Sequence, residues 1–175
     1  RYPEAHNVVL IDRLGLLPRR GDRYPVDYSA SKFTVWKIES DQCSEVQIHA
    51  DGFRRIDDNI IWKRIVRLLD GGAEIIDTVT GSGAHRFSSY FHFAPELELH
   101  SNNNNGYLIS GQSINGLISI TMPPELHISL HKGGRSPVGW QVISYGAAIE
   151  STTMELSGRI ELPIQVSLQI SWSPD

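Results

Sequence analysis

The sequence predicts an all-β protein, an antiparallel β-sandwich made of two packed sheets with many short strands. Three observations predict it. Apolar and polar residues alternate along most of the chain, which gives each such segment one face for a core and one for water. Asp-Gly, Asn-Gly and Gly-Gly pairs, which accept the backbone of tight hairpin turns, separate these segments. The segments recur at the roughly 8–12-residue spacing of sandwich folds, and none keeps a sustained helical period of 3.6.

Length and composition set limits on the protein class. The 175 residues predict one domain, 1–175, large enough to bury a core, and 40% hydrophobic with 21% charged residues is ordinary for a globular protein. The net charge of −4 argues against a nucleic-acid partner. No apolar stretch approaches the roughly 20 residues of a membrane span, so no membrane partner is expected. The single cysteine, Cys43, cannot form a disulfide within the chain.

The N-terminal half contains an apolar run and several alternating segments. In chain order they read "VVLID", "FTVWKIES", "SEVQIHAD", "NIIWKRIVRLL", "AEIIDTVTG" and "HRFSSYFHF". Only "IIWKRIVRLL" could be mistaken for a helix, but its β-branched residues and its Gly-Gly exit favour a strand. Residues 13–32 are rich in Pro, Arg, Gly and Asp and predict an irregular connection.

The C-terminal half continues the pattern with "LELH", "YLIS", "GLISITM", "ELHISLHK", "GWQVISYG" and "TTMELSG". The polar run "SNNNNG" predicts a loop tip. The clearest alternation runs from Ile160 to Trp172, where every second residue is apolar. We expect one strand there, the longest of the fold, with an edge position or a bulge at Pro163 because proline lacks a backbone donor.

Motifs with chemistry are scarce. The chain has seven histidines but no HExxH, CxxC, P-loop or GxSxG motif, so no stand-alone catalytic or metal motif is present. His127 and His131 lie four residues apart on an expected strand. At about 3.3 Å per residue they would be roughly 13 Å apart, too far to share one metal ion.

Two groups of residues are candidates for a site. The first is a basic stripe, which could face a polyanion or be the solvated face of a strand. Its members are Arg54, Arg55, Lys63, Arg64 and Arg67. The second is the pair His6-Asn7 at the entry to an apolar strand, where buried polar groups need partners or a metal. The alternative reading is that Asn7 closes a turn and His6 caps the strand.

Several segments resemble, in the same order, those of the heparinase II/III-like polysaccharide lyases. "RYPEAHNVVLID" resembles that family's Arg…His-Asn-Thr-apolar-apolar-Asp segment, with Val8 in place of Thr. "IHADGFRR" resembles its His-x-Gly-Tyr stretch, with Phe53 in place of Tyr. "WKRIVRLLDGGAEIIDTVTGSGAHRFSSYFHFAP" and the tail from "VGWQVISYG" to "LQISW" are similar to its later strands. The resemblance covers essentially the whole chain.

The resemblance implies a helical (α/α) toroid followed by an antiparallel β-sandwich, with the substrate in the groove between them. The reaction implied by the resemblance is β-elimination from a uronic acid, in which a base removes the proton next to a carboxylate whose charge must be neutralised. This chain would be the C-terminal sandwich, without catalytic residues and inactive alone, because the family's His-x-His-x-Asp strand and helical domain lie upstream. With no initiator Met and no signal segment, we expect an excised fragment or a processed chain.

The resemblance also assigns roles. His6 takes the position of the third ligand of a structural zinc, whose other ligands, a His and an Asp, come from upstream strands. Zinc needs three or four protein ligands, so we expect no bound zinc in this chain alone. The implied partners are an acidic polysaccharide, met by the basic stripe, and the missing helical domain. A periplasmic or secreted location is implied as well.

Two other readings remain open, since sandwiches serve many unrelated functions. The chain could be a non-catalytic carbohydrate-binding or structural module, or a subunit whose missing strands come from a partner chain.

Overall fold

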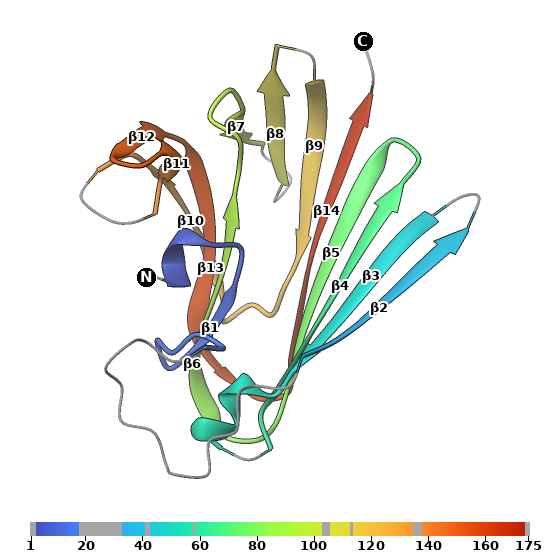
Figure 1. Ribbon diagram of the computed structural model, residues 1–175, viewed down its shortest axis with the longest axis vertical. Coiled ribbons are helices and arrows are strands. Elements are labelled where there is room, and N and C mark those ends of the chain that lie inside the picture. Colours follow the sequence, from blue (N-terminus) through green and yellow to red (C-terminus); the bar gives the residue numbers. More distant parts are fainter. Residues whose placement is uncertain are drawn as a thin grey trace.

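Two antiparallel sheets pack face to face, which confirms the predicted all-β sandwich (Figure 1). The structure is a computed structural model that describes residues 3–17, 33–40, 43–57, 59–102, 106–112, 114–134 and 138–173. In these ranges the chain forms 14 strands and two short 3-10 helices, η1 (Pro3–Ala5) and η2 (Gly52–Arg55). The predicted irregular connection over 13–32 and the loop tip of "SNNNNG" lie largely outside the described residues.

The larger sheet has eight strands in the order β2-β3-β4-β5-β14-β9-β8-β7. Their bounds are β2 (Phe33–Ser40), β3 (Cys43–Ala50), β4 (Ile61–Leu69), β5 (Gly72–Thr80), β14 (Ile164–Ser173), β9 (Ile114–Thr121), β8 (Gly106–Gly111) and β7 (Glu98–Ser101). β4 and β5 form a hairpin around Asp70-Gly71, and Gly71 has a φ of 70°, a conformation that glycine adopts without strain. The ambiguous segment "IIWKRIVRLL" is therefore a strand, as predicted.

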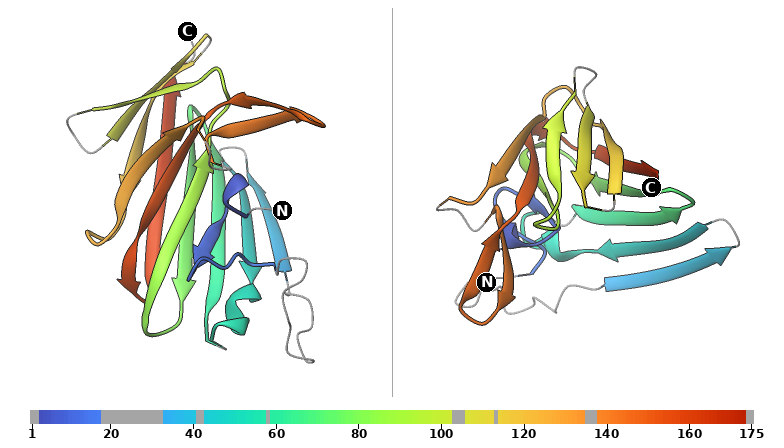
Figure 2. Two further views of the ribbon diagram at one scale, coloured as in Figure 1. Left: turned by 90° about the vertical axis from the view of Figure 1, so that its left-hand side faces the viewer. Right: turned by 90° about the horizontal axis from the view of Figure 1, so that it is seen from above.

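The smaller sheet has the order β1-β6-β13-β10. It contains β1 (Val9–Ile11), β6 (Ala84–His92), β13 (Thr152–Glu161) and β10 (His127–Lys132). A separate hairpin of β11 (Trp140–Ser144) and β12 (Ala147–Glu150) projects from the sandwich in both views of Figure 2. The core between the sheets includes Phe53, Trp62, Phe87, Phe91, Met154 and Leu168.

The prediction of one long strand over Ile160–Trp172 is wrong. The chain changes sheets at Leu162-Pro163, so β13 ends in the smaller sheet and β14 begins in the larger one. Pro163 cannot donate to a ladder, and the chain crosses the sandwich there instead of bulging. β14 lies between β5 and β9 and is not an edge strand.

The alternation nevertheless marks the core face correctly on both strands. Ile160 and Leu162 on one side of the crossing, and Ile164, Val166 and Leu168 on the other, are all at most 8% exposed. Both strands point their apolar side chains toward the same space between the sheets, because the crossing keeps the order of inward and outward positions.

Candidate functional site

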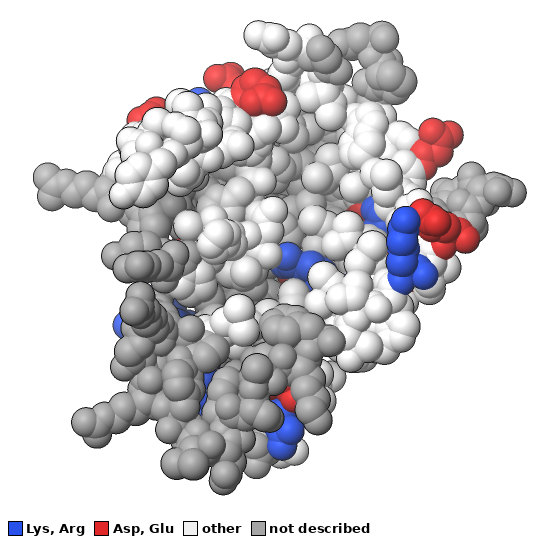
Figure 3. Space-filling model, viewed as in Figure 1, with Lys and Arg blue, Asp and Glu red and all other residues white. Residues whose placement is uncertain are grey.

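The smaller sheet covers only part of the larger one and leaves a hollow. In Figure 1, β2, β3 and β4 diverge from β1 and β6, and Figure 3 shows a depression with a basic side chain inside it. Two apolar side chains on the inner face of this region are largely exposed, Val35 at 60% and Leu68 at 56%. The hollow is therefore bordered by the strands that carry most of the predicted basic stripe.

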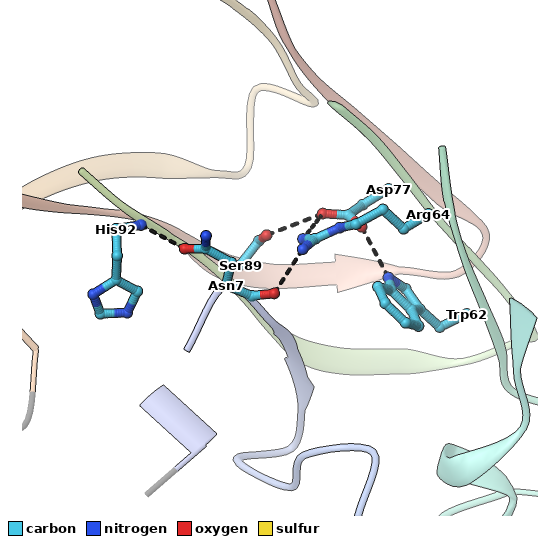
Figure 4. Close-up of polar contacts among 6 residues, drawn as sticks. All are labelled: Asn7, Trp62, Arg64, Asp77, Ser89 and His92. Atoms are coloured by element: carbon cyan, nitrogen blue, oxygen red, sulfur yellow. Dashed lines mark hydrogen bonds and ion pairs between the residues drawn. The ribbon is translucent and has the colours of Figure 1, made fainter. Parts of the chain in front are cut away.

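A buried ion pair joins Arg64 of β4 to Asp77 of β5 on the inner side of the larger sheet (Figure 4). The guanidinium donates from Nε to Oδ1 at 2.7 Å and from Nη2 to Oδ2 at 2.6 Å, a two-pronged geometry that is stronger than a single contact. Trp62 Nε1 donates to Oδ1 at 2.9 Å and Ser89 Oγ to Oδ2 at 3.2 Å. The Asp77 carboxylate, 1% exposed, thus accepts four hydrogen bonds, which offset its loss of hydration.

Strand register creates this pair. Arg64 on β4 lies directly opposite Asp77 on β5, and both occupy inward positions together with Trp62. The guanidinium carbon also lies 5.3 Å from the ring centre of Trp62 and 5.7 Å from that of Phe91. Aromatic ring faces attract a cation. The rings of Trp62 and Phe91 therefore stabilise the guanidinium charge by cation–π contacts, in addition to the ion pair with Asp77.

The same arginine fixes the N-terminal segment. Arg64 Nη1 donates to the backbone oxygen of Asn7 at 2.6 Å, and Asn7 Oδ1 accepts from the backbone N–H of His92 at 2.6 Å. Asn7 therefore fastens the chain to β6 before β1 begins. His6, one residue earlier, has an exposed side chain and makes a backbone turn to Pro3 at 3.1 Å.

His92 lies under this segment, and both of its ring nitrogens are occupied. Nε2 is 3.0 Å from the backbone oxygen of Glu4, and Nδ1 is 2.9 Å from Thr153 Oγ1. Burial lowers the pKa of His92 below its usual 6.5, the Glu4 carbonyl offsets part of the effect, and the charge of His6 lowers it further. A neutral His92 with both nitrogens engaged is a structural residue here.

A second polar chain crosses the outer face of the smaller sheet. Tyr90 Oη donates to Glu155 Oε1 at 3.2 Å, and His131 Nε2 is 2.9 Å from Glu155 Oε2. Burial, followed by the charge of Glu155, raises the pKa of Tyr90 to about 12. Tyr90 therefore stays protonated near neutral pH and acts as a hydrogen-bond donor rather than a base.

The five residues of the predicted basic stripe do not share one surface. Arg54 and Arg55 lie in η2, where Arg54 is 3.9 Å from Asp51 and Arg55 donates to the backbone oxygen of Gly15. Arg64 points inward, whereas Lys63 and Arg67 point out of the larger sheet.

Arg67 is committed to acidic neighbours on that outer face. It lies 2.5 Å from Glu45 and 2.7 Å from Glu74. Hydrogen bonds to the two carboxylates raise the pKa of Arg67, and hydrogen bonds from Gln47 and Arg67 lower the pKa of Glu45. The predicted basic stripe did not include Asp77, which is the buried ion-pair partner of Arg64. Its position on the inward face of β5, between Ile75 and Val79, was a signal in the sequence that this carboxylate is buried.

The role of His6 as a zinc ligand stays a prediction. Within the described ranges, no group of three or more His, Cys, Asp and Glu side chains is arranged to hold a metal ion. His6 supplies one exposed imidazole at the edge of the smaller sheet, which fits a zinc site only if other ligands come from beyond this chain.

Asp12 and His85 form a pH-sensitive contact at the end of β1. His85 Nδ1 is 2.8 Å from Asp12 Oδ2, and the backbone N–H of Arg86 donates to Asp12 Oδ1 at 2.9 Å. The bond to Asp12 raises the pKa of His85 above 6.5, although burial opposes it. Burial raises the pKa of Asp12, but the bonds from His85 and Arg86 outweigh it and leave that pKa below 3.8.

We expect His85→Gln to lower the Tm most between pH 4 and 6.5. The charged His85 stabilises the fold fully below its unfolded pKa of 6.5, and this is lost as the pH rises through the raised folded value. The Asp12 contribution is lost only as the pH falls below 3.8. A partly exposed pair contributes about 0.5–1 kcal/mol, which corresponds to roughly 1–4 °C in Tm for a chain of this size. His100→Gln, at an exposed histidine beside Glu98, is the control. A Tm difference that is constant from pH 5 to pH 8 would contradict the pairing.

Comparisons with known proteins identify relatives of this architecture. The family model for the heparinase II/III-like C-terminal domain matches residues 1–172. A heparinase III gene product superimposes with a TM-score of 0.70 at 16% identity, over 100% of this chain and 25% of that one. The heparan sulfate lyase HepC of Pedobacter heparinus gives 0.69 at 8% identity over the same shares. Another heparinase III structure gives 0.67 at 13% identity, over 97% of this chain and 24% of that one.

These likenesses, at such low identities, show a shared fold. The chain spans about a quarter of the length of each of these structures. A search of curated proteins found no match. None of the helices in the described ranges has the length and apolar character needed to cross a membrane.

Proposed function

The chain belongs to the heparinase II/III-like family through its C-terminal domain, and from this we propose that it is the C-terminal β-sandwich of a polysaccharide lyase. The lyase would cleave uronic-acid polysaccharides by β-elimination, together with a helical domain upstream of this chain. The match over residues 1–172 is the observation that carries the proposal. The likeness to about a quarter of each heparinase structure supports a chain that acts as part of a larger protein.

The chemistry explains why further residues are needed. The proton next to a uronate carboxylate is hardly acidic until a donor offsets the carboxylate charge, and a base must then reach it. In the described part of the chain, Arg64 is committed to Asp77, and His92 has both nitrogens bonded. Tyr90 is held as a donor to Glu155. We therefore assign the base and the carboxylate neutraliser to the upstream region, and the sandwich to forming one wall of the substrate groove.

We expect this chain alone to give no elimination product. The product of β-elimination carries a conjugated double bond that absorbs in the ultraviolet, so the reaction is followed by absorbance. Heparan sulfate, alginate and hyaluronan are the substrates to test, with the full-length parent as the positive control. Rising absorbance from the chain alone would overturn the assignment of the base and the carboxylate neutraliser to the upstream region. A parent that is inert on every uronic-acid polysaccharide would instead count against the lyase.

We also propose that His6 becomes a zinc ligand when the upstream His and Asp are present in the same polypeptide. Zinc there would be structural and would join the smaller sheet to preceding strands. We expect His6→Ala to leave the Tm of this chain unchanged, because the side chain is exposed. In the parent, the same change should release zinc and lower the Tm, whereas His100→Ala, at an exposed histidine, should do neither. Zinc retained by the mutated parent would remove His6 from the ligand set.

A non-catalytic carbohydrate-binding or structural module is the alternative function. The parent sequence separates the two. The lyase predicts about 350 upstream residues of amphipathic helices, which is room for a toroid at roughly 100–200 residues per domain, followed by a His-x-His-x-Asp strand. A native mass measurement would reveal a partner chain, if separate subunits complete the fold. We propose a secreted or periplasmic location, where an acidic polysaccharide would be met.

A further inference from the structure

The outer face of the larger sheet carries a row of polar and aromatic side chains opposite to the Arg64 side. Cross-strand pairing places His49 beside Lys63, Lys63 beside Thr78, and Thr78 beside Gln165. These residues belong to β3, β4, β5 and β14, so the row crosses four adjacent strands. At roughly 4.8 Å per strand it spans about 14 Å, perpendicular to the strands.

An exposed tryptophan stands at one end of the row. Trp36, on the edge strand β2, is 44% exposed and points to the same outer face, since it pairs with Gln47 and Gln47 pairs with the outward Ile65. Its ring packs against the His49 ring at 5.0 Å between centres and at 83°. His49 Nε2 is buried and has no hydrogen-bond partner among the described residues. The imidazole thus supports the indole and fixes its orientation.

The central cation of the row makes no direct ion pair among the described residues, although the charge of Lys63 helps to lower the pKa of Glu45 on the neighbouring strand. Across the described ranges, Lys63 makes no ion pair or side-chain hydrogen bond, whereas its neighbour Arg67 on the same face is held between Glu45 and Glu74. No acidic residue belongs to the row itself. Thr78 Oγ1 donates to Gln165 Oε1 at 3.4 Å, a long bond between two exposed side chains that a ligand hydroxyl can replace.

We propose that Trp36, His49, Lys63, Thr78 and Gln165, the glycan row, form an accessory binding site for an acidic polysaccharide laid across the strands. The Trp36 ring packs against the apolar face of a sugar ring, the Lys63 ammonium meets a carboxylate or sulfate, and Thr78 and Gln165 bond to hydroxyls. The polysaccharide class rests on the proposed function. Because the row and Arg64 lie on opposite faces of one sheet, the glycan row would retain the polymer away from the hollow.

The test measures the affinity of the 175-residue chain for a heparan sulfate hexasaccharide and an alginate hexasaccharide, with a neutral cello-oligosaccharide of equal length for comparison. Loss of one aromatic stacking contact removes about 0.5–1.5 kcal/mol, so Trp36→Ala should weaken binding roughly two- to tenfold. Lys63→Gln should weaken binding of the acidic hexasaccharides and reduce its salt dependence. Trp36→Tyr should retain most of the affinity because it keeps an aromatic ring.

Two matched controls lie elsewhere on the surface. Lys37→Gln removes the same charge from the opposite face of β2, where Lys37 is 2.5 Å from Glu39. Tyr145→Ala removes a fully exposed aromatic ring from the turn between β11 and β12. Neither should change the affinity. Circular dichroism checks the fold of each variant, and if Trp36→Ala unfolds, Lys63→Gln against Lys37→Gln decides.

The results of these measurements distinguish the glycan-row proposal from the proposed lyase function. Equal losses from Lys63→Gln and Lys37→Gln, equal affinity for the neutral oligosaccharide, or no binding of either acidic hexasaccharide would each overturn the glycan row. The parent is assayed for elimination on the same polymers. Binding that depends on Trp36 and Lys63, together with an inert parent, would keep the row and reject the lyase. An active parent, together with an affinity that neither Trp36→Ala nor Lys63→Gln changes, would keep the lyase and reject the glycan row.

Discussion

Replacing Leu168 by glutamate is expected to unfold the domain. Leu168 is 1% exposed in the middle of β14, opposite Ile75 of β5 on one side and Ile120 of β9 on the other. A carboxylate there would lose its hydration without gaining a partner, and the packing of the leucine would be lost as well. The combined cost exceeds about 4 kcal/mol, a large part of the 5–15 kcal/mol that stabilises a typical domain. The expected readout is loss of the β-sheet circular dichroism spectrum at 25 °C or a sharply lowered Tm.

Gln169→Glu is the matched control at the next position. Gln169 is exposed on the outer face of β14 and pairs with Glu74 and Ser119 on its neighbours. The same carboxylate remains hydrated there, and the change should stay within about 0.5 kcal/mol, allowing for weak repulsion from Glu74. Equal effects from the two substitutions would show that the inward and outward faces of β14 are exchanged.

Alternation predicted the strands well because burial of one face imposes it directly. β4 lies within a segment that the pattern marks, and β5, β6, β13 and β14 each match marked residues to within one position at their ends or joins. The same pattern could not reveal that the chain changes sheets at Leu162-Pro163, since both strands face one core and every second residue stays apolar through the crossing. The pattern does not predict β12, because "AAIE" shows too little alternation of apolar and polar residues. Its hairpin projects from the sandwich (Figure 2), so no core requires one of its faces to be apolar.

The candidate site was predicted less completely, for a different physical reason. Each face of β4 carries both apolar and basic residues, Trp62 and Arg64 on one and Ile65 and Arg67 on the other, so the pattern alone does not say which face is buried. Asp77, at an apolar position of β5, was the available signal that a cation must point inward. The bond between Asn7 and His92 joins residues 85 positions apart and depends on tertiary packing that no local pattern encodes.

Arg64→Met is expected to destabilise the domain by about 3–5 kcal/mol. It leaves the Asp77 carboxylate buried with only Trp62 and Ser89 as donors, and it removes the donor to the backbone oxygen of Asn7. Arg64→Lys should recover only part of the loss, because an ammonium cannot reproduce the two-pronged contact with Asp77 and the bond to Asn7 together. Denaturant unfolding followed by circular dichroism measures the free energies. Arg67→Met, at a 35% exposed side chain between two carboxylates, is the control and should cost about 1 kcal/mol or less.

The double variant Arg64→Met/Asp77→Leu distinguishes pairing from bulk packing. If the cost of Arg64→Met comes from an uncompensated carboxylate, removing that carboxylate as well should restore part of the stability, giving a coupling energy above 1 kcal/mol. Release of Asn7 has its own signature: hydrogen exchange at the backbone N–H of His92 should accelerate in Arg64→Met, because Asn7 Oδ1 accepts that proton only while Arg64 holds the segment. Additive costs in the double variant, with unchanged exchange at His92, would show that Arg64 neither needs Asp77 nor positions the segment that carries His6.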